Sequence, residues 1–172
     1  MASDVMVEAG YYELISFKIT SLIGAMGEGI ELNQIVTSWQ ISEGLHQTNV
    51  SGSAMVLDAE GVIRKLDNKG ILGEETITIK YKDFFGDERE DTYFVYGVRS
   101  VQPFDPTNEK MLSYRLDFTS MENFNASQKE VANSYNNMKI SDMAKEVYNE
   151  FFEGPKPFEV EETEGFHTLV IP

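Results

Sequence analysis

The sequence has 172 residues, which is enough for one domain, or for one domain and the start of a second. Its 14 Lys and Arg residues are outnumbered by 29 Asp and Glu residues, and the resulting net charge of −15 disfavours binding to nucleic-acid phosphates and to anionic membranes. Hydrophobic residues make up 41% of the chain, so it can bury a core, which excludes global disorder.

Several features of the sequence bear on its compartment. It contains no cysteine, which excludes disulfides, a thiolate nucleophile and a cysteine-type zinc site. Residues 1–12 lack a basic region followed by an apolar run, so we expect no secretory signal there. No stretch approaches the roughly 18 uncharged apolar residues of a membrane-spanning helix. These features agree with assembly in the cytoplasm.

Strand patterns begin near the N-terminus. Residues 11–22 predict a first strand, and the glycine-rich residues 24–29 predict a flexible loop after it. Residues 30–41 predict a second strand, in which Trp39 and Ile41 share one face. We expect Trp39 to be a core anchor, because a buried tryptophan is more common than a tryptophan kept for a partner.

The third strand is expected at residues 50–58. Its apolar run from Ala54 to Leu57 predicts burial on both faces. Residues 60–66 are compatible with a short helical turn.

The clearest hairpin signal lies at the centre of the chain. Residues 76–81 alternate apolar and polar side chains, residues 85–88 predict a polar turn, and residues 92–101 alternate again. We expect Pro103 and Pro106 to end this second strand of the hairpin, because proline cannot donate a hydrogen bond to a ladder.

A sixth strand is expected at residues 112–119, where apolar and polar residues alternate strictly. Each of these strands keeps one apolar face under the two-residue period. We therefore expect one barrel core that contains Ile77, Ile79, Phe94, Tyr96, Leu112, Tyr114, Leu116 and Phe118.

Beyond residue 120 the pattern becomes helical or irregular. A helix is expected from about residue 142 to 152, capped by Ser141 and stopped by the Gly-Pro pair at 154–155. The apolar face of this helix consists of Ile140, Met143, Val147 and Phe151. A last strand is expected at residues 167–171, where an apolar run stops in mid-pattern, so we expect a longer protein.

Six strands joined by short turns predict a mainly β fold, a closed or nearly closed antiparallel barrel or sandwich, with a short helix after the barrel strands and α+β overall. We expect the barrel domain to cover residues 1–127. Residues 128–172 then hold the helix and the start of a second region.

No pattern of catalytic residues is present. His46 and His167 lie far apart, and the serine segment 50–54 is not G-x-S-x-G. We expect no catalytic residue, no cofactor, no metal and no enzymatic activity. A carboxylate pair for glycosidic chemistry stays open, because such pairing is spatial, although the acidic residues 87–91 and 159–164 are more typical of solvated charge.

Six segments follow one another in a distinctive order and spacing: residues 38–45 (SWQISEGL), 50–58 (VSGSAMVLD), 73–79 (GEETITI), 93–96 (YFVY), 114–118 (YRLDF) and 139–142 (KISD). This series resembles the N-terminal part of baseplate hub proteins of contractile-tail bacteriophages, and the likeness covers residues 11–152. The loop after Glu43 departs from the family pattern, because it contains Gly44 and His46 in place of an acidic-aromatic or proline-bearing turn.

The resemblance implies a tail-tube-like antiparallel β-barrel and a structural virion protein. It implies a homotrimer that links the tail tube protein to the central spike protein and contacts other baseplate proteins. Its contact with phage DNA during genome ejection would be transient and non-specific, without membrane insertion. The expected location is the virion tail baseplate, after assembly in the cytoplasm of the host bacterium. The alternative is a monomeric carbohydrate-binding or carbohydrate-processing β-domain, in which acidic residues converge on a pocket.

Within such a ring, the polar face of the second and third strands is a candidate lining of the lumen. The opposite face carries Trp39 and Ile41, which need burial, so the polar side must meet water. A DNA-conducting channel would supply that water, and an ordinary outer surface explains the pattern equally well. The candidate lumen residues are Ser38, Gln40, Ser42, Ser51 and Ser53.

Overall fold

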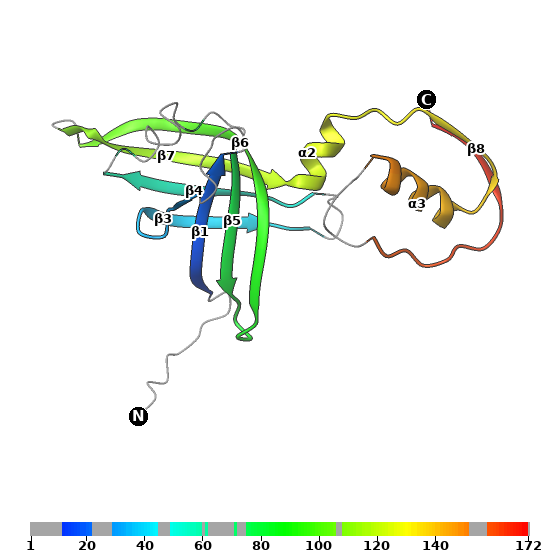
Figure 1. Ribbon diagram of the computed structural model, residues 1–172, viewed down its shortest axis with the longest axis horizontal. Helices are drawn as coiled ribbons and strands as arrows, with labels where there is room; N and C mark the ends of the chain where they lie inside the picture. Colours follow the sequence, from blue (N-terminus) through cyan, green and yellow to red (C-terminus); the bar gives the residue numbers. More distant parts are fainter. Residues whose placement is uncertain are drawn as a thin grey trace. The chain divides into compact units, whose positions relative to one another are not determined.

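The structure is a computed structural model, and it confirms a mainly β fold (Figure 1). The chain divides into two compact units, Met1–Ser120 and Met121–Pro172, which are described in turn. The described residues are 12–21, 29–44, 49–59, 61, 71, 75–105, 108–151 and 158–171.

The first unit is one antiparallel sheet of seven strands that curls into a half-barrel (Figure 1). The strand order is β2-β1-β5-β6-β7-β4-β3, and the ladder does not close within the described part of the chain, where a closed or nearly closed barrel was expected. The strands are β1 (Glu13–Ser21), β2 (Ile30–Glu31), β3 (Val36–Ser42), β4 (Ser51–Asp58), β5 (Glu75–Lys82), β6 (Glu88–Asp105) and β7 (Asn108–Ser120).

A tight turn connects the two edge strands of this sheet. The prediction of one strand over residues 30–41 is wrong, because residues 32–35 turn between β2 and β3. Leu32 is fully buried, its N–H donates to the carbonyl of Phe17 at 2.7 Å, and Asn33 Nδ2 donates to the carbonyl of Ile15 at 2.6 Å. The chain itself therefore joins the two ends of the curled sheet at this corner.

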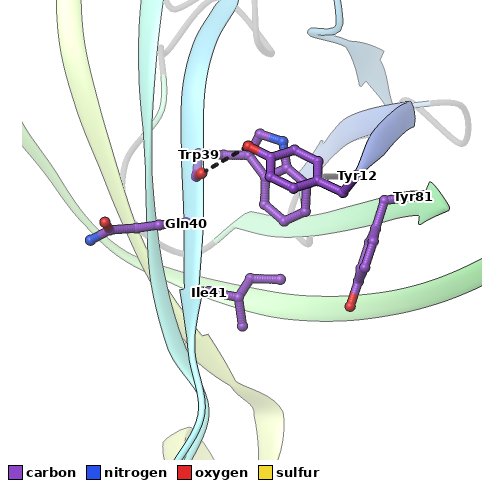
Figure 2. Close-up of a pocket in the computed structure, with 5 residues that line it drawn as sticks. All are labelled: Tyr12, Trp39, Gln40, Ile41 and Tyr81. Carbon is purple, nitrogen blue, oxygen red and sulfur yellow. Dashed lines mark hydrogen bonds between the residues drawn. The ribbon is translucent and has the colours of Figure 1, made fainter. Parts of the chain in front are cut away.

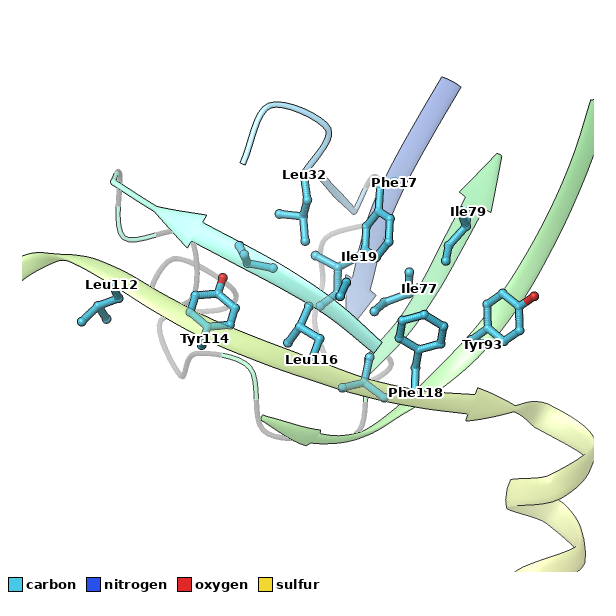
Figure 3. Close-up of a cluster of buried hydrophobic side chains, with 13 residues drawn as sticks. Phe17, Ile19, Leu32, Ile77, Ile79, Tyr93, Leu112, Tyr114, Leu116 and Phe118 are labelled. Carbon is cyan, nitrogen blue, oxygen red and sulfur yellow. The ribbon is translucent and has the colours of Figure 1, made fainter. Parts of the chain in front are cut away.

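The core occupies the inner face of the sheet (Figure 3). The predicted core residues of β5 and β7 all belong to it, which confirms the faces assigned to those two strands. The cluster consists of Phe17, Ile19, Leu32, Ala54, Val56, Ile77, Ile79, Tyr93, Val95, Leu112, Tyr114, Leu116 and Phe118.

The face predicted for β6 is wrong. Tyr93 and Val95 point into the core, Phe94 is buried outside that cluster, and Tyr96 is 50% exposed. A β-bulge between Val95 and Gly97 adds one residue to the strand, so the alternation slips and Val98 returns to the core side.

Two smaller expectations for this unit are also wrong. In β4, Ala54 and Val56 are buried while Met55 is half-buried, so burial is one-sided. Pro103 does not end β6, which continues to Asp105 and pairs with β7. Beyond Phe94 the strand has no ladder to β5, and such an edge is where a strand tolerates proline. Of the helical turn expected at residues 60–66 only Gly61 is described, and Pro106 lies outside the described residues.

The second unit contains helix α2 (Met121–Ser127), strand β8 (Asn133–Met138), helix α3 (Ile140–Phe151) and strand β9 (His167–Ile171). Strand β9 is confirmed and pairs antiparallel with β8, which was not predicted. Neither helix is long and apolar enough to cross a membrane.

Helix α3 begins earlier than predicted. Ser141 lies inside the first turn instead of capping it, and its hydroxyl accepts a hydrogen bond from Thr163 N at 3.3 Å. Met143 is buried as expected, whereas Ile140 is exposed, because it is the first residue of the helix. The expected stop at residues 154–155 lies outside the described part of the chain.

Candidate functional site

The five candidate lumen residues lie together on the face of β3 and β4 that points away from the core. The register places Gln40 opposite Ser53 and Ser42 opposite Ser51. The three residues of β3 are exposed, and the two serines of β4 are half-buried. The alternation predicted for β3 is confirmed, while the assignment of this polar stripe to a lumen stays a prediction.

The polar face continues onto β7, where Asp117 lies opposite Ser53. Only 6% of the Asp117 side chain is exposed, and it is contacted by two arginines that pair across β6 and β7. Arg99 Nε lies 2.9 Å from Asp117 Oδ2, and Arg115 Nη2 donates to the same oxygen at 3.3 Å. Arg115 Nε is also 2.9 Å from Oδ1, but its N–H is not directed at an acceptor.

This Arg-Asp-Arg cluster carries one more positive than negative charge. Arg99 and Arg115 both keep part of their side chains exposed, so the cluster offers cationic N–H groups beside the neutral stripe. This cluster was not predicted from the sequence, because Arg99 and Arg115 lie opposite each other only through the register of β6 and β7. The local signal was the Arg115-x-Asp117 spacing, which places both side chains on one face of a strand.

A second feature is an aromatic hollow of about 310 Å³ on the inner side of the sheet, where β3 faces the start of β1 and the end of β5 (Figure 2). Figure 2 shows the side chains of Tyr12, Trp39, Ile41 and Tyr81 around the hollow, with the side chain of Gln40 pointing away. Trp39 packs against the core while half-buried, so it serves as the anchor that was predicted.

The aromatic rings of the hollow contact one another edge to face. The ring centroids of Tyr12 and Trp39 are 4.5 Å apart, and those of Trp39 and Tyr81 are 5.3 Å apart. Tyr12 Oη also donates to the carbonyl of Trp39 at 3.4 Å. These contacts join strands that are not neighbours in the sheet, so the rings bridge the open side of the half-barrel.

The causes of the raised pKa of Tyr81 indicate the sign of the electrostatic field in the hollow. Burial raises the pKa of its phenol, and the nearby carboxylates of Asp91, Glu43 and Asp83 raise it further, while Arg89 opposes them. Arg89 is itself in an ion pair with Asp83, with 3.4 Å between Nε and Oδ2. The field at the phenol is therefore negative.

The residues considered for catalysis do not form a site in the described part of the chain. His167 is exposed on β9, and His46 lies outside the described residues. No group of three or more His, Asp or Glu side chains among the described residues could hold a metal ion. At the β5–β6 hairpin the carboxylates of Asp87, Glu88 and Glu90 are exposed, as expected for solvated charge, whereas Asp91 is half-buried and departs from that expectation. The absence of enzymatic activity stays a prediction.

No family model matches the chain, and a search of curated proteins finds no match. The resemblance to baseplate hub proteins therefore rests on the sequence segments themselves.

Proposed function

We propose that this chain is a structural virion protein of a contractile tail baseplate, a central hub that links the tail tube to the central spike. The observation that supports this function is where the resembling segments lie. Residues 38–45 and 50–58 contribute to the paired strands β3 and β4, and the three segments that follow contribute residues to β5, β6 and β7. Five of the resembling segments thus contribute to one curled antiparallel sheet, as a tail-tube-like barrel would require.

The open edges of the half-barrel suit assembly into a ring. Strand β3 ends the sheet on one side, and β6 beyond Phe94 pairs only with β7 in the described part of the chain. Unpaired strand edges are templates for another chain. In the proposed hub they make the contacts of a homotrimer and of its attachment to the tail tube protein, the central spike protein and other baseplate proteins.

The polar stripe suits a channel wall. Its residues are small or neutral, and a chain with a net charge of −15 has few basic side chains that could displace the counterions of DNA, so DNA would pass without being held. The arginines next to the stripe are held by Asp117, which limits their attraction for phosphates. In this proposal the protein works in the virion tail baseplate after assembly in the host cytoplasm, and contacts DNA only transiently during genome ejection.

A monomeric carbohydrate-binding or carbohydrate-processing domain is the second candidate, because the aromatic hollow could stack a sugar ring. The geometry of the hollow gives this second candidate only weak support. The described residues that line it include no carboxylate side chain, and the amide of Gln40 points away (Figure 2). A glycosidic site needs two close carboxylates on the bound sugar, so the hub function agrees better with the geometry.

The experiment that tests the hub function is native mass spectrometry of the purified chain, followed by electron microscopy of the assembled species. We expect a mass of three chains, and a ring with the polar stripe on its inner wall. A chain that stays monomeric at every concentration and binds oligosaccharides would contradict the hub and favour the second candidate. A ring with the stripe on its outer rim would overturn the lumen assignment alone.

A further inference from the structure

The aromatic hollow has the chemistry of a cation site. We propose that the hollow bounded by Tyr12, Trp39 and Tyr81 binds the cationic end of a lysine or arginine side chain from a partner protein. This inference does not depend on the hub function, because it follows from the rings, the space between them and the charges around them.

The geometry provides room and suitable surfaces. An apolar cavity of about 150 Å³ is large enough for a benzene ring, so a hollow of about 310 Å³ can take a guanidinium or ammonium group together with part of its stem. Aromatic faces attract such cations electrostatically, and tryptophan attracts them most strongly. Ile41, which also lines the hollow, offers an apolar contact for the methylene stem (Figure 2).

The charges around the hollow decide between a cation and a neutral apolar group. Glu43 follows β3 directly, and Asp91 lies opposite Ile79 in the register, on the core side of the sheet. Together with Asp83, they act on the Tyr81 phenol more strongly than Arg89 does. A positively charged side chain gains from this field, whereas a neutral side chain gains only from burial.

The main competing occupant is the β5–β6 hairpin tip of a second copy, which exposes Phe84 and Phe85. The tip brings the carboxylates of Asp83 and Asp87 with it. Docking would place these carboxylates against the Glu43 and Asp91 of the first copy. Like charges disfavour this occupant, and a basic segment of a partner complements the field.

The test uses the intrinsic fluorescence of Trp39, the only tryptophan of the chain, which lines the hollow. N-acetyl-lysine amide and N-acetyl-arginine amide are titrated at low ionic strength. N-acetyl-norleucine amide, which has a similar stem without a charge, is the neutral probe. We expect saturable changes with both cationic probes, and an affinity roughly three- to thirty-fold higher than that of the neutral probe.

Variants assign the effect to the hollow. Tyr81→Leu keeps the Trp39 reporter and should abolish the preference for cations. Glu43→Gln should weaken lysine and arginine binding without changing norleucine binding. Glu90→Gln is the matched control, because it removes the same charge from the opposite face of β6 and should leave all three titrations unchanged.

Equal affinities for charged and neutral probes would overturn the proposal, and so would the absence of a saturable signal. If Glu43→Gln and Glu90→Gln weakened the binding of the cationic probes equally, the overall charge of the protein would explain the effect. That result would also contradict the proposal. If circular dichroism shows that Tyr81→Leu does not fold, the two glutamate variants decide the question.

Discussion

Gly52 shows how a single residue type is imposed by packing. It lies opposite Phe118 in the β4–β7 ladder, and the Phe118 ring covers the position where a side chain would begin. A Cβ atom on Gly52 would come within 2.3 Å of Phe118 Cε2 and 2.5 Å of the Gln40 carbonyl oxygen. The backbone oxygen cannot move aside cheaply, so only glycine fits between the two serines of this segment.

We therefore expect Gly52→Ala to lower the free energy of unfolding by about 1–3 kcal/mol, as overpacking does in other cores. Urea denaturation measures this loss. Gly97→Ala is the matched control, because the nearest atom to its added methyl group would be Arg99 Nε at 3.7 Å, an ordinary contact. Equal losses in the two variants would show that close packing against Phe118 is not the cause.

Tyr114 carries a buried polar atom in the centre of the core. Its hydroxyl has no hydrogen-bond partner in the described part of the chain. Burial raises the pKa of the phenol above its ordinary value, and the neighbouring Asp58 raises it further. At neutral pH, Tyr114→Phe removes an unsatisfied group and keeps the ring, so we expect the stability to change by less than about 1 kcal/mol.

The same variant has a signature at alkaline pH. Because the folded-state pKa of Tyr114 is raised, its contribution to stability is fully present below the pKa of the unfolded chain, about 10, and is lost as the pH rises above that value. We expect Tyr114→Phe to flatten the loss of stability between roughly pH 9 and 11. Unfolding curves measured across this range check it, and parallel pH profiles of the two proteins would contradict it.

At the scale of an element, the turn between β5 and β6 is organised by one carboxylate. Asp83 Oδ1 accepts hydrogen bonds from the backbone N–H groups of Phe85 at 2.9 Å and Asp87 at 3.0 Å. Gly86 adopts a positive φ of 89°, which completes the turn. The result is an ordered tip on which the Phe85 side chain is 84% exposed.

We expect Asp83→Ala to destabilise the protein by about 1 kcal/mol or less, and to raise hydrogen exchange at the amides of Phe85 and Asp87. Hydrogen exchange followed by NMR resolves these two amides. Phe85→Ser is the control, because its ring makes little contact with the core, and it should leave both stability and exchange unchanged. Unaltered exchange in Asp83→Ala would show that the carboxylate does not order the tip.

The elements also show which parts of the fold can be predicted from the sequence. β5 and β7 alternate without interruption, so their core faces were assigned correctly. The face of β6 was not, because its bulge at Tyr96 changes the alternation, and a bulge depends on the partner strand as much as on local residues. β8 was missed since it has few apolar residues, and its pairing with β9 joins segments far apart in the chain.

Of the two candidate sites, the polar stripe could be predicted from the sequence and the aromatic hollow could not. The polar stripe is a property of two consecutive strands, so the alternation of Ser38, Gln40 and Ser42 was enough to predict it. The aromatic hollow unites Tyr12, Trp39 and Tyr81, which come from three parts of the sequence. Their meeting depends on the strand order and on the curl of the sheet, and no local pattern encodes either.

At the scale of the whole molecule, the unclosed sheet is the feature most relevant to assembly. Beyond Phe94 the second half of β6, here called the β6 arm, is paired on one side only, with β7, and this arm exposes Val101 and Phe104. An open strand edge with exposed apolar side chains is a template for pairing with another chain. In the proposed hub, pairing with a neighbouring chain would bury these side chains and satisfy the free edge.

A charge on this arm should therefore weaken assembly while leaving the fold intact. We expect Val101→Lys to shift the proposed trimer towards monomer at least about tenfold, because a lysine on an edge strand opposes pairing. Val101 is 52% exposed, so its replacement should change the stability of the monomer by less than about 0.5 kcal/mol. Sedimentation equilibrium measures the association, and urea denaturation measures the fold.

Val170→Lys on β9 is the matched control, because it replaces the same residue type at a site that is 68% exposed in the second unit. An equal loss of association in both variants would show that added charge alone opposes assembly, and an unchanged trimer in Val101→Lys would exclude the β6 arm from the contact.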